Sequence, residues 1–452
     1  MDVIASLSGM IRTHRRLVIL LAVALLLRLL LMPLWAYLPN DYTDEGFWKD
    51  WMLAIHQHGL LNIFHTTTDY VGYHYVLWLL SLIYDAAGGV YGSDVTGLHL
   101  LVKAPPILFD LGLIVAVYAV ALSLFREMRL ARAESLALLA AGVFAVQPAV
   151  LYDSAVWSQT DSAVTLAMLL SVFLVARRRT ELGFGVWAAG FLIKPHPIIV
   201  LPLLVYLAWR NGIKPFARSF AVVAGVWSVA LSPWVLHGDL GRILHVYGGL
   251  FGANYERLSA NAWNFWWFFD LALHPKPDQV AFAFLTYRML GLVMTAAAGF
   301  LALLYLHARP TLAGALVAAA YLAFAFYLLP ISTHDRYLYP FLALLLPLVI
   351  AESRWRWLYA VVSVTFFFNL AVVAPPIHSF SGRWVESPFT LAVAAVNCAV
   401  FALLTLTVAR VAVPTARMLA RRGWSSAVRG VGRIAGGATV PAEGGGERPP
   451  AA

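Results

Sequence analysis

Residues 17–35 read LVILLAVALLLRLLLMPLW, and the chain then turns polar over residues 37–51, YLPNDYTDEGFWKDW. The apolar run predicts a membrane-spanning helix, because about 20 apolar residues cross the hydrocarbon core. Carboxylates and tryptophans follow at once: Asp41, Asp44, Glu45, Asp50, Trp48 and Trp51. Acids where a helix leaves the bilayer are well sited to act on a molecule that the membrane holds. The alternative is a solvated loop with aromatic anchors, since Trp and Tyr favour the interface.

The composition extends this interpretation to the whole chain. Of 452 residues, 61% are hydrophobic and 12% are charged, whereas soluble domains carry about 25% charged residues. The chain is therefore expected to be a polytopic membrane protein. The first apolar run lacks a signal-peptide cleavage site and is expected to remain as an anchor. A single cysteine, Cys398, excludes a disulfide framework and a cysteine metal site.

The distribution of positive charge predicts the topology. Arginine-rich clusters separate the apolar runs, and cytoplasmic loops collect Lys and Arg. Placing every cluster inside gives an all-α fold of twelve spans with both termini cytoplasmic, in the inner membrane. The predicted spans are 17–36, 98–124, 135–151, 163–176, 183–194, 197–209, 217–236, 285–307, 312–330, 337–351, 357–374 and 389–413. The net charge of +9 is then a topology signal, and no nucleic-acid partner is expected.

This topology divides the chain into a transmembrane domain, residues 1–413, and a basic cytoplasmic tail, 414–452, that is largely disordered and lies against membrane lipid. Two large loops face outside, 37–97 and 237–284. The run 75–87 is too short for a span and is expected to lie on or dip into the outer face. KPHP at 194–197 breaks a helix at its prolines, which predicts a turn near the outer surface.

Polar residues in apolar surroundings fall on the outer side, and an ionisable residue at membrane depth usually marks a site. They are Asp41, Asp44, Asp69, Asp153, Gln159, Asp161, Lys194, His196, Asn261, Asn264, His334, Asp335 and Arg336. Three groups have structural alternatives. Arg28 either snorkels or pairs with an acid. Lys103 and Asp110 share one helix face and could only brace it. Trp263, Trp266 and Trp267 fit an interfacial belt or a groove for a sugar or isoprenoid.

Seven motifs in this order resemble the GT-C superfamily of membrane glycosyltransferases, in particular bacterial mannosyltransferase-like proteins that use polyprenyl-phosphate sugars. The motifs cover about residues 1–350: DEGFWKDWMLAIHQHG (44–59), DYVGYHYVLWLL (69–80), KAPPILFDL (103–111), VWSQTDS (156–162), KPHP (194–197), NAWNFWW (261–267) and STHDRYLYP (332–340). The chain departs from the family at three places. Val71-Gly72 stands for Pro-Pro, Ser158 for Gly, and Asp335 for Glu.

The resemblance implies a helical fold with a cavity on the outer face, covered by interfacial helices of the first loop. It also implies that an acid in this loop is the catalytic base, with Asp44 at the family position and Asp41 as runner-up. The expected reaction is an inverting transfer of a hexose, mannose by resemblance, from a polyprenyl-phosphate sugar to a hydroxyl. The acceptor is a glycan, glycolipid or protein.

The remaining roles follow from the chemistry. A phosphate leaving group needs cations rather than a general acid. Arg336 and Lys194, assisted by His334 and His196, are expected to bind the phosphate, since Arg suits two-point contact. Sugar or acceptor contacts, or orientation of the cations, are assigned to a second set: Gln159, Asp161, Asn264, Trp263 and Asp69. Lys103, Asp110 and Arg28 are expected to line the lipid path or brace the fold.

No cofactor is expected, and the alternative is a divalent cation shared by Asp41 and Asp44. Two other function classes fit a polytopic chain. A lipid or sugar transporter would show broken helices, polar groups near the midplane and inverted repeats, and the sequence has a break at 194–197 but no visible repeat. A non-catalytic scaffold would not need acids and cations on one face.

Overall fold

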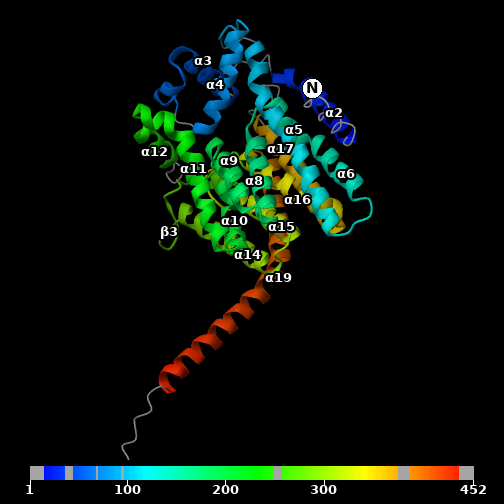
Figure 1. Ribbon diagram of the computed structural model, residues 1–452, viewed down its shortest axis with the longest axis vertical. Helices are drawn as coiled ribbons and strands as arrows, with labels where there is room; N and C mark the ends of the chain where they lie inside the picture. Colours follow the sequence, from blue (N-terminus) through cyan, green and yellow to red (C-terminus); the bar gives the residue numbers. More distant parts are fainter. Residues whose placement is uncertain are drawn as a thin grey trace, which may run out of the picture.

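The computed structural model describes residues 15–35, 44–67, 70–92, 96–248, 257–374 and 387–436, with the side chains of Asp44 and of 422–436 outside the description. The described chain is a helical bundle with one long helix, α19, projecting from its lower end (Figure 1). The first half of the bundle contains α2 (Arg15–Leu31), η1 (Met32–Trp35), α3 (Asp44–His58), η3 (Leu60–His65), α4 (Val71–Ala86), α5 (Thr96–Glu127), α6 (Ala133–Ala145), α7 (Pro148–Leu151), η4 (Tyr152–Val156), α8 (Asp161–Ala176), α9 (Thr180–Ile193) and η5 (His196–Val200).

The second half continues with α10 (Leu201–Asn211), α11 (Ile213–His237), α12 (Leu240–Gly248), β1 (Ser259–Ala260), α13 (Trp267–Leu273), β2 (Val280–Phe282), β3 (Leu285–Thr286), α14 (Tyr287–Ala308), α15 (Leu312–Leu328), β4 (Thr333–His334), η6 (Asp335–Leu338), α16 (Tyr339–Ala351), η7 (Ser353–Trp355), α17 (Arg356–Val373) and α19 (Pro388–Gly436). β1 and β4 form a parallel pair with Ser259 opposite Thr333. This pair joins the second large loop to the segment that carries Arg336.

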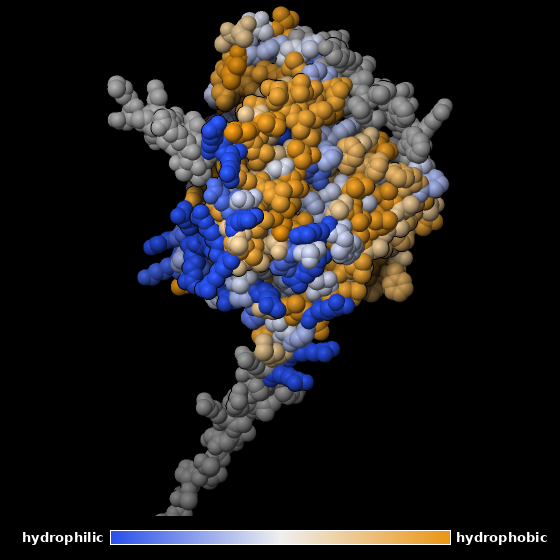
Figure 2. Space-filling view, turned by 90° about the vertical axis from the view of Figure 1, so that its right-hand side faces the viewer, coloured by the Kyte–Doolittle hydropathy of each residue, from blue (hydrophilic) through white to orange (hydrophobic). Residues whose placement is uncertain are grey.

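Burial separates a central pair of helices from a peripheral set. α15 and α16 are buried on nearly every side, which is the pattern of helices in the interior of a large bundle. α2 and α11 instead expose large apolar side chains, such as Leu30 at 68% and Leu236 at 87%. Figure 2 shows apolar residues over much of one face, with hydrophilic residues gathered lower, toward the end from which α19 projects. Exposed apolar helices of this kind indicate a membrane-embedded protein.

The structure confirms the all-α membrane class but not twelve crossings. In the described residues six helices are long and apolar enough to span a bilayer: Arg15–Leu34, Thr96–Glu127, Ile213–His237, Tyr287–Ala308, Ser353–Val373 and Pro388–Arg421. A seventh span results if Ala133–Ala145 and Pro148–Val156, which meet at a 52° bend, count as one. The other predicted spans are helical but short, because turns such as KPHP interrupt the apolar runs.

One helix boundary differs from the sequence-based expectation. α19 runs through Pro414 to Gly436, so the predicted domain boundary at 413 does not coincide with a helix end. Residues 75–86 belong to α4, which packs against α3 and α9, and Ala87 is its C-cap. Among the residues described, α4 does not meet the length and composition criteria for a span.

Candidate functional site: a buried cluster of cations and carboxylates

Lys194 and Arg336, which are far apart in the chain, converge on one carboxylate, that of Asp161. The Lys194 ammonium lies 3.1 Å from each Asp161 oxygen, and Arg336 Nε lies 3.6 Å from Oδ2. The Arg336 guanidinium is also 3.5 Å from Asp335 Oδ1. The Asp161 side chain is fully buried, and those of Lys194 and Arg336 are 14% and 13% exposed. The structure thus brings together four residues named from the sequence.

Each residue of this cluster lies at the end of a helix, and the local sequence explains why. Lys194 caps α9, because Pro195 and Pro197 cannot continue that helix. Asp161 is the first residue of α8, where a negative charge is favoured by the helix dipole. Arg336 lies in the short turn η6 that precedes α16.

Aromatic rings frame the two cations. The Arg336 guanidinium lies 5.5 Å from the centre of the Trp157 ring, and the Lys194 ammonium lies 5.5 Å from that of Tyr337. Both distances fall within the range of a cation–π interaction. His196 stacks edge-on against Tyr337 with centroids 4.0 Å apart, and His334 lies 5.1 Å from the same ring.

The two histidines occupy turns between helices and are expected to be neutral. Burial, and then the positive charges of Lys194 and Arg336, hold the pKa of His196 well below its usual value. The same burial and the same two cations hold the pKa of His334 well below its usual value. Neutral imidazoles add hydrogen-bonding capacity but no charge, and the buried Nε2 of His196 has no hydrogen-bond partner in the described part of the chain.

Asp153 is a fully buried carboxylate that had no role assigned from the sequence. Neither of its oxygens has a hydrogen-bond partner among the residues described, although buried polar groups are nearly always paired. It interacts electrostatically with Asp161, Lys194, Asp110 and Arg336, so it borders the cluster. Its backbone lies in a π-helical turn, a distortion frequent at functional sites.

Gln159 lies in the loop that links this turn to α8. It is 1% exposed, and its backbone N–H donates to the Asp153 carbonyl at 2.9 Å. Trp48 of α3 donates its indole N–H to the Ser158 carbonyl at 3.2 Å. Since Ser158 follows Trp157, this contact sets the first-loop helix against the segment whose Trp157 ring the Arg336 guanidinium contacts. The start of α3 and the cation cluster therefore lie at the same end of the bundle.

Ser158 also explains one departure from the family pattern. Its φ is +66°, in the left-handed region that favours glycine. Its buried hydroxyl has no hydrogen-bond partner among described residues. The glycine in the pattern that the sequence resembles is thus the residue that this backbone prefers.

Gly72 accounts for another departure. A Cβ at this position would lie 2.6 Å from the backbone of Leu192 and Ile193, which directly precede Lys194. The absence of a side chain allows α4 to approach the end of α9. Gly72 therefore helps to fix the position of the Lys194 backbone.

The residues expected to guide lipid or brace the fold form two separate networks. Of the two alternatives for Arg28, the structure shows pairing, with its Nε 2.9 Å from Asp110 Oδ2 and both side chains fully buried. Asp110 also accepts a hydrogen bond from Tyr339 at 2.6 Å and one from Ser154. Such a pair ties α2, α5, η4 and α16 together.

Lys103 belongs to the second network, whose centre is an acid that sequence reasoning passed over. Glu45, 1% exposed, contacts the His99 ring nitrogen Nδ1, and its other oxygen is 3.8 Å from the Lys103 ammonium. Lys49 lies 3.3 Å from His99 Nε2. This network anchors the start of α3 to α5. The signal available beforehand was the i, i+4 spacing of His99 and Lys103, which puts both on one helix face.

Asn264 and Trp263 support the site from the second large loop. Asn264 donates to Tyr327 O at 3.1 Å and to Thr333 Oγ1 at 2.6 Å, and it accepts from two backbone N–H groups. These contacts hold the loop beside the segment that leads to Arg336. Trp263, Trp266 and Trp267 are at most 1% exposed, so the interfacial belt is wrong: they fill the space between this loop and its neighbours.

Three of the predicted acids lie outside this description. Asp41 and Asp69 are not among the described residues, and Asp44 begins α3 without a described side chain. Among the side chains that the structure does describe, no three His, Cys, Asp or Glu are grouped to hold a metal ion.

Comparison with known proteins adds no family assignment. A scan against descriptions of protein families finds no match, and a search of curated proteins finds no match either.

Proposed function

We propose that the protein is an inverting glycosyltransferase that moves a hexose, mannose by resemblance, from a polyprenyl-phosphate sugar to an acceptor hydroxyl at the extracytoplasmic membrane face. The observation that carries the proposal is the convergence of Lys194 and Arg336 on Asp161. These cations lie at the same end of the bundle as the start of α3, where the proposed base Asp44 stands.

The donor phosphate would be bound chiefly by Arg336. The two cations face two carboxylates, Asp161 and Asp335, so a phosphate has to replace a carboxylate contact. Lys194 holds both Asp161 oxygens at 3.1 Å, whereas Arg336 lies 3.6 and 3.5 Å from Asp161 and Asp335. Arg336 also offers the planar fork that matches a phosphate.

The neutral histidines suit the second task, which is to contact the sugar and the leaving oxygen without adding charge. The buried Nε2 of His196 is open to such a partner in the described part of the chain. Both oxygens of the Asp153 carboxyl group lack a hydrogen-bond partner among the described residues, and the hydroxyl groups of a sugar would supply partners. The acceptor hydroxyl then needs one base, for which a carboxylate in the first loop is suited.

Asp44 and Glu45 are adjacent, and only one of them is expected to be the base. Glu45 is already held by His99 and Lys103, which favours a structural role for it. Replacement of Asp44 by Asn is therefore expected to abolish transfer, while Glu45→Gln is expected to lower protein yield or stability. Loss of transfer in a well-folded Glu45→Gln variant, together with full activity of Asp44→Asn, would reverse the two roles.

The reaction is tested with the purified protein in proteoliposomes and radiolabelled polyprenyl-phosphate mannose, with membrane extract as acceptor. Arg336→Ala is expected to lower kcat/KM for the donor by roughly 10–100-fold, the effect of losing a hydrogen bond to a charged group. Arg288→Ala is the matched control, since Arg288 pairs with Asp278 away from the cluster. No labelled product from the wild-type protein with any polyprenyl-phosphate sugar would refute the proposal.

A transporter is the second candidate, favoured by two observations. The helix pair that leads to Asp153 is bent by 52°, and Asp153 is a buried carboxylate whose oxygens lack a hydrogen-bond partner among described residues. Broken helices and buried acids are typical of transport pathways. The same proteoliposomes distinguish the two functions, because a transporter moves labelled substrate across the bilayer without forming a new glycosidic bond.

A further inference from the structure

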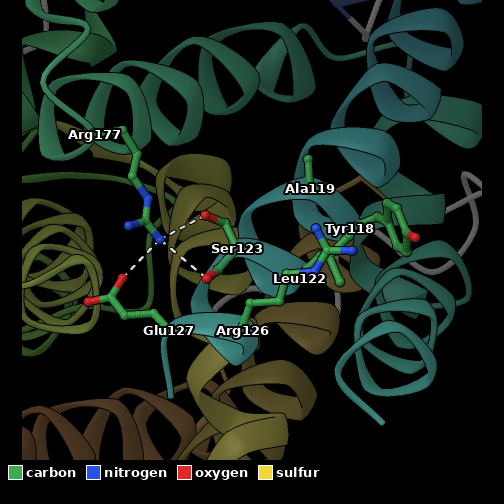
Figure 3. Close-up of a pocket in the computed structure, with 7 residues that line it drawn as sticks. All are labelled: Tyr118, Ala119, Leu122, Ser123, Arg126, Glu127 and Arg177. Carbon is green, nitrogen blue, oxygen red and sulfur yellow. Dashed lines mark hydrogen bonds and ion pairs between the residues drawn. The ribbon is translucent and has the colours of Figure 1, made fainter. Parts of the chain in front are cut away.

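A pocket of about 670 Å³ opens near the end of α5, in contact with the end of α8. Arg126 and Arg177 line it together with Tyr118, Ala119 and Leu122 (Figure 3). Arg126 lies about 35 Å along α5 from Lys103, at 1.5 Å per residue. Since Lys103 contacts the first-loop helix, this pocket is at the other end of the bundle from the cation cluster around Asp161.

The apolar part of the pocket continues a lipid-facing stripe. α5 is one of the helices long and apolar enough to span a membrane. Val115, Ala119 and Leu122 share one face of it, and Arg126 follows on the same face one turn later. Val115 is 39% exposed, and Ala119 and Arg126 are exposed as well. An acyl chain lying along this stripe would therefore lead directly to a guanidinium.

The two arginines differ in how they are held. Arg177 donates to Ser123 Oγ at 2.7 Å and pairs with Glu127 at 2.8 Å. Its buried Nε has no hydrogen-bond partner among described residues. In Figure 3 Arg126 points away from this trio, on the side of Tyr118 and Leu122. No hydrogen bond or ion pair holds Arg126 within the described part of the chain, so the pocket keeps one uncompensated positive charge.

The loops beside the pocket retain arginine where the backbone favours glycine. Arg129, Arg132 and Arg178 have φ of 55°, 62° and 61°, in the left-handed region that residues with a Cβ rarely adopt. This end of the bundle thus concentrates positive charge around a pocket that already has an apolar wall.

We propose that the pocket binds one anionic phospholipid of the surrounding bilayer. The lipid phosphate would contact the Arg126 guanidinium, and one acyl chain would lie on Val115, Ala119 and Leu122. Basic pockets between membrane helices bind anionic headgroups in this way. The site is independent of the glycosyl-transfer proposal, because it lies at the opposite end of the bundle.

The test is native mass spectrometry of the full-length protein in neutral detergent, titrated with phosphatidylglycerol or phosphatidylcholine of the same acyl chains. The wild-type protein is expected to retain one phosphatidylglycerol with an affinity about tenfold or more above that for phosphatidylcholine, the factor that one hydrogen bond to a charged group supplies. Arg126→Gln is expected to remove this preference. Arg309→Gln, an equal charge change at an exposed arginine outside the pocket, is expected to keep it.

A second variant tests the apolar wall. Ala119→Trp fills the stripe at an exposed position and is expected to weaken phosphatidylglycerol binding by a similar factor. Equal binding of the two lipids to the wild-type protein would overturn the proposal, and so would the same lipid preference in Arg126→Gln and Arg309→Gln. Displacement of the lipid by an equal concentration of glycerol phosphate would also overturn it, because the site would then recognise free phosphate rather than a lipid.

Discussion

Removing the Asp110 carboxylate while Arg28 stays in place is expected to destabilise the protein far more than removing both charges together. Both side chains are fully buried, with Arg28 Nε 2.9 Å from Asp110 Oδ2. In Asp110→Leu the guanidinium loses its only anionic contact among the described residues, and a buried charge left without its partner costs about 3–5 kcal/mol. Tyr339 loses its acceptor as well, which adds about 1–3 kcal/mol for an unsatisfied buried hydroxyl.

The double variant Arg28→Leu/Asp110→Leu removes the cost of the unpaired buried guanidinium but keeps the cost of the unsatisfied Tyr339 hydroxyl. Ser154 adds little in either variant, because its hydroxyl also donates to Val150 O at 3.0 Å. The double variant is therefore expected to be more stable than Asp110→Leu by about 3–5 kcal/mol. Adding Tyr339→Phe removes the unsatisfied hydroxyl and is expected to recover about 1–3 kcal/mol more.

The measurement is unfolding of each variant in mixed micelles, followed by tryptophan fluorescence, with the coupling energy taken from the double-mutant cycle. The Arg28→Leu single variant completes the cycle. If the losses of stability in the two single variants add up to the loss in the double variant, the coupling energy is zero and the two side chains do not depend on each other. The argument that this pair joins α2 to the centre of the bundle would then be wrong.

Two further substitutions test the backbone positions around the cation cluster. Ser158→Gly is expected to raise stability by about 1 kcal/mol, since it relieves a left-handed residue and removes an unpaired buried hydroxyl. Ser162→Gly makes the same change within helix α8 and is expected to lower stability instead. Gly72→Ala is expected to lower stability by about 1–3 kcal/mol through overpacking, because the new Cβ would meet the end of α9. Thermal unfolding in detergent measures both, and Gly225→Ala, on α11 with open space around it, is the control that should cause no loss.

The sequence was sufficient for the class of fold because the bilayer constrains local chemistry strongly. Long apolar runs between arginine clusters have few alternatives to membrane helices. It could not determine the number of crossings, since a run such as 183–194 is helical whether it spans the membrane or ends inside it. The structure shows where such runs are interrupted, at the bend before Asp153 and at the KPHP turn.

The site was predictable in part because the bilayer also constrains where charged residues can stand. Charged residues in apolar runs are costly, so Asp161, Lys194 and Arg336 were recognisable from the sequence, and the structure brings them into contact. Glu45 stands among other acids of a polar loop, and the local sequence does not distinguish the buried acid from the exposed ones. Asn264 was assigned to the sugar or acceptor or to orienting the cations, and the tryptophans around it to an interfacial belt or a groove, whereas the structure shows them as buried supports.

The amino-acid sequence by itself thus determined that the chain is a helical membrane protein and which ionisable residues are out of place in it, because both depend on local hydrophobicity and charge. Only the tertiary structure decided which of these residues lie against one another. Arg28 and Arg336 are both arginines in apolar surroundings, but Arg28 is bound to Asp110, whereas Arg336 lies beside Asp161, Asp335 and the Trp157 ring. That distinction arises from helices far apart in the chain, whose packing no local pattern encodes.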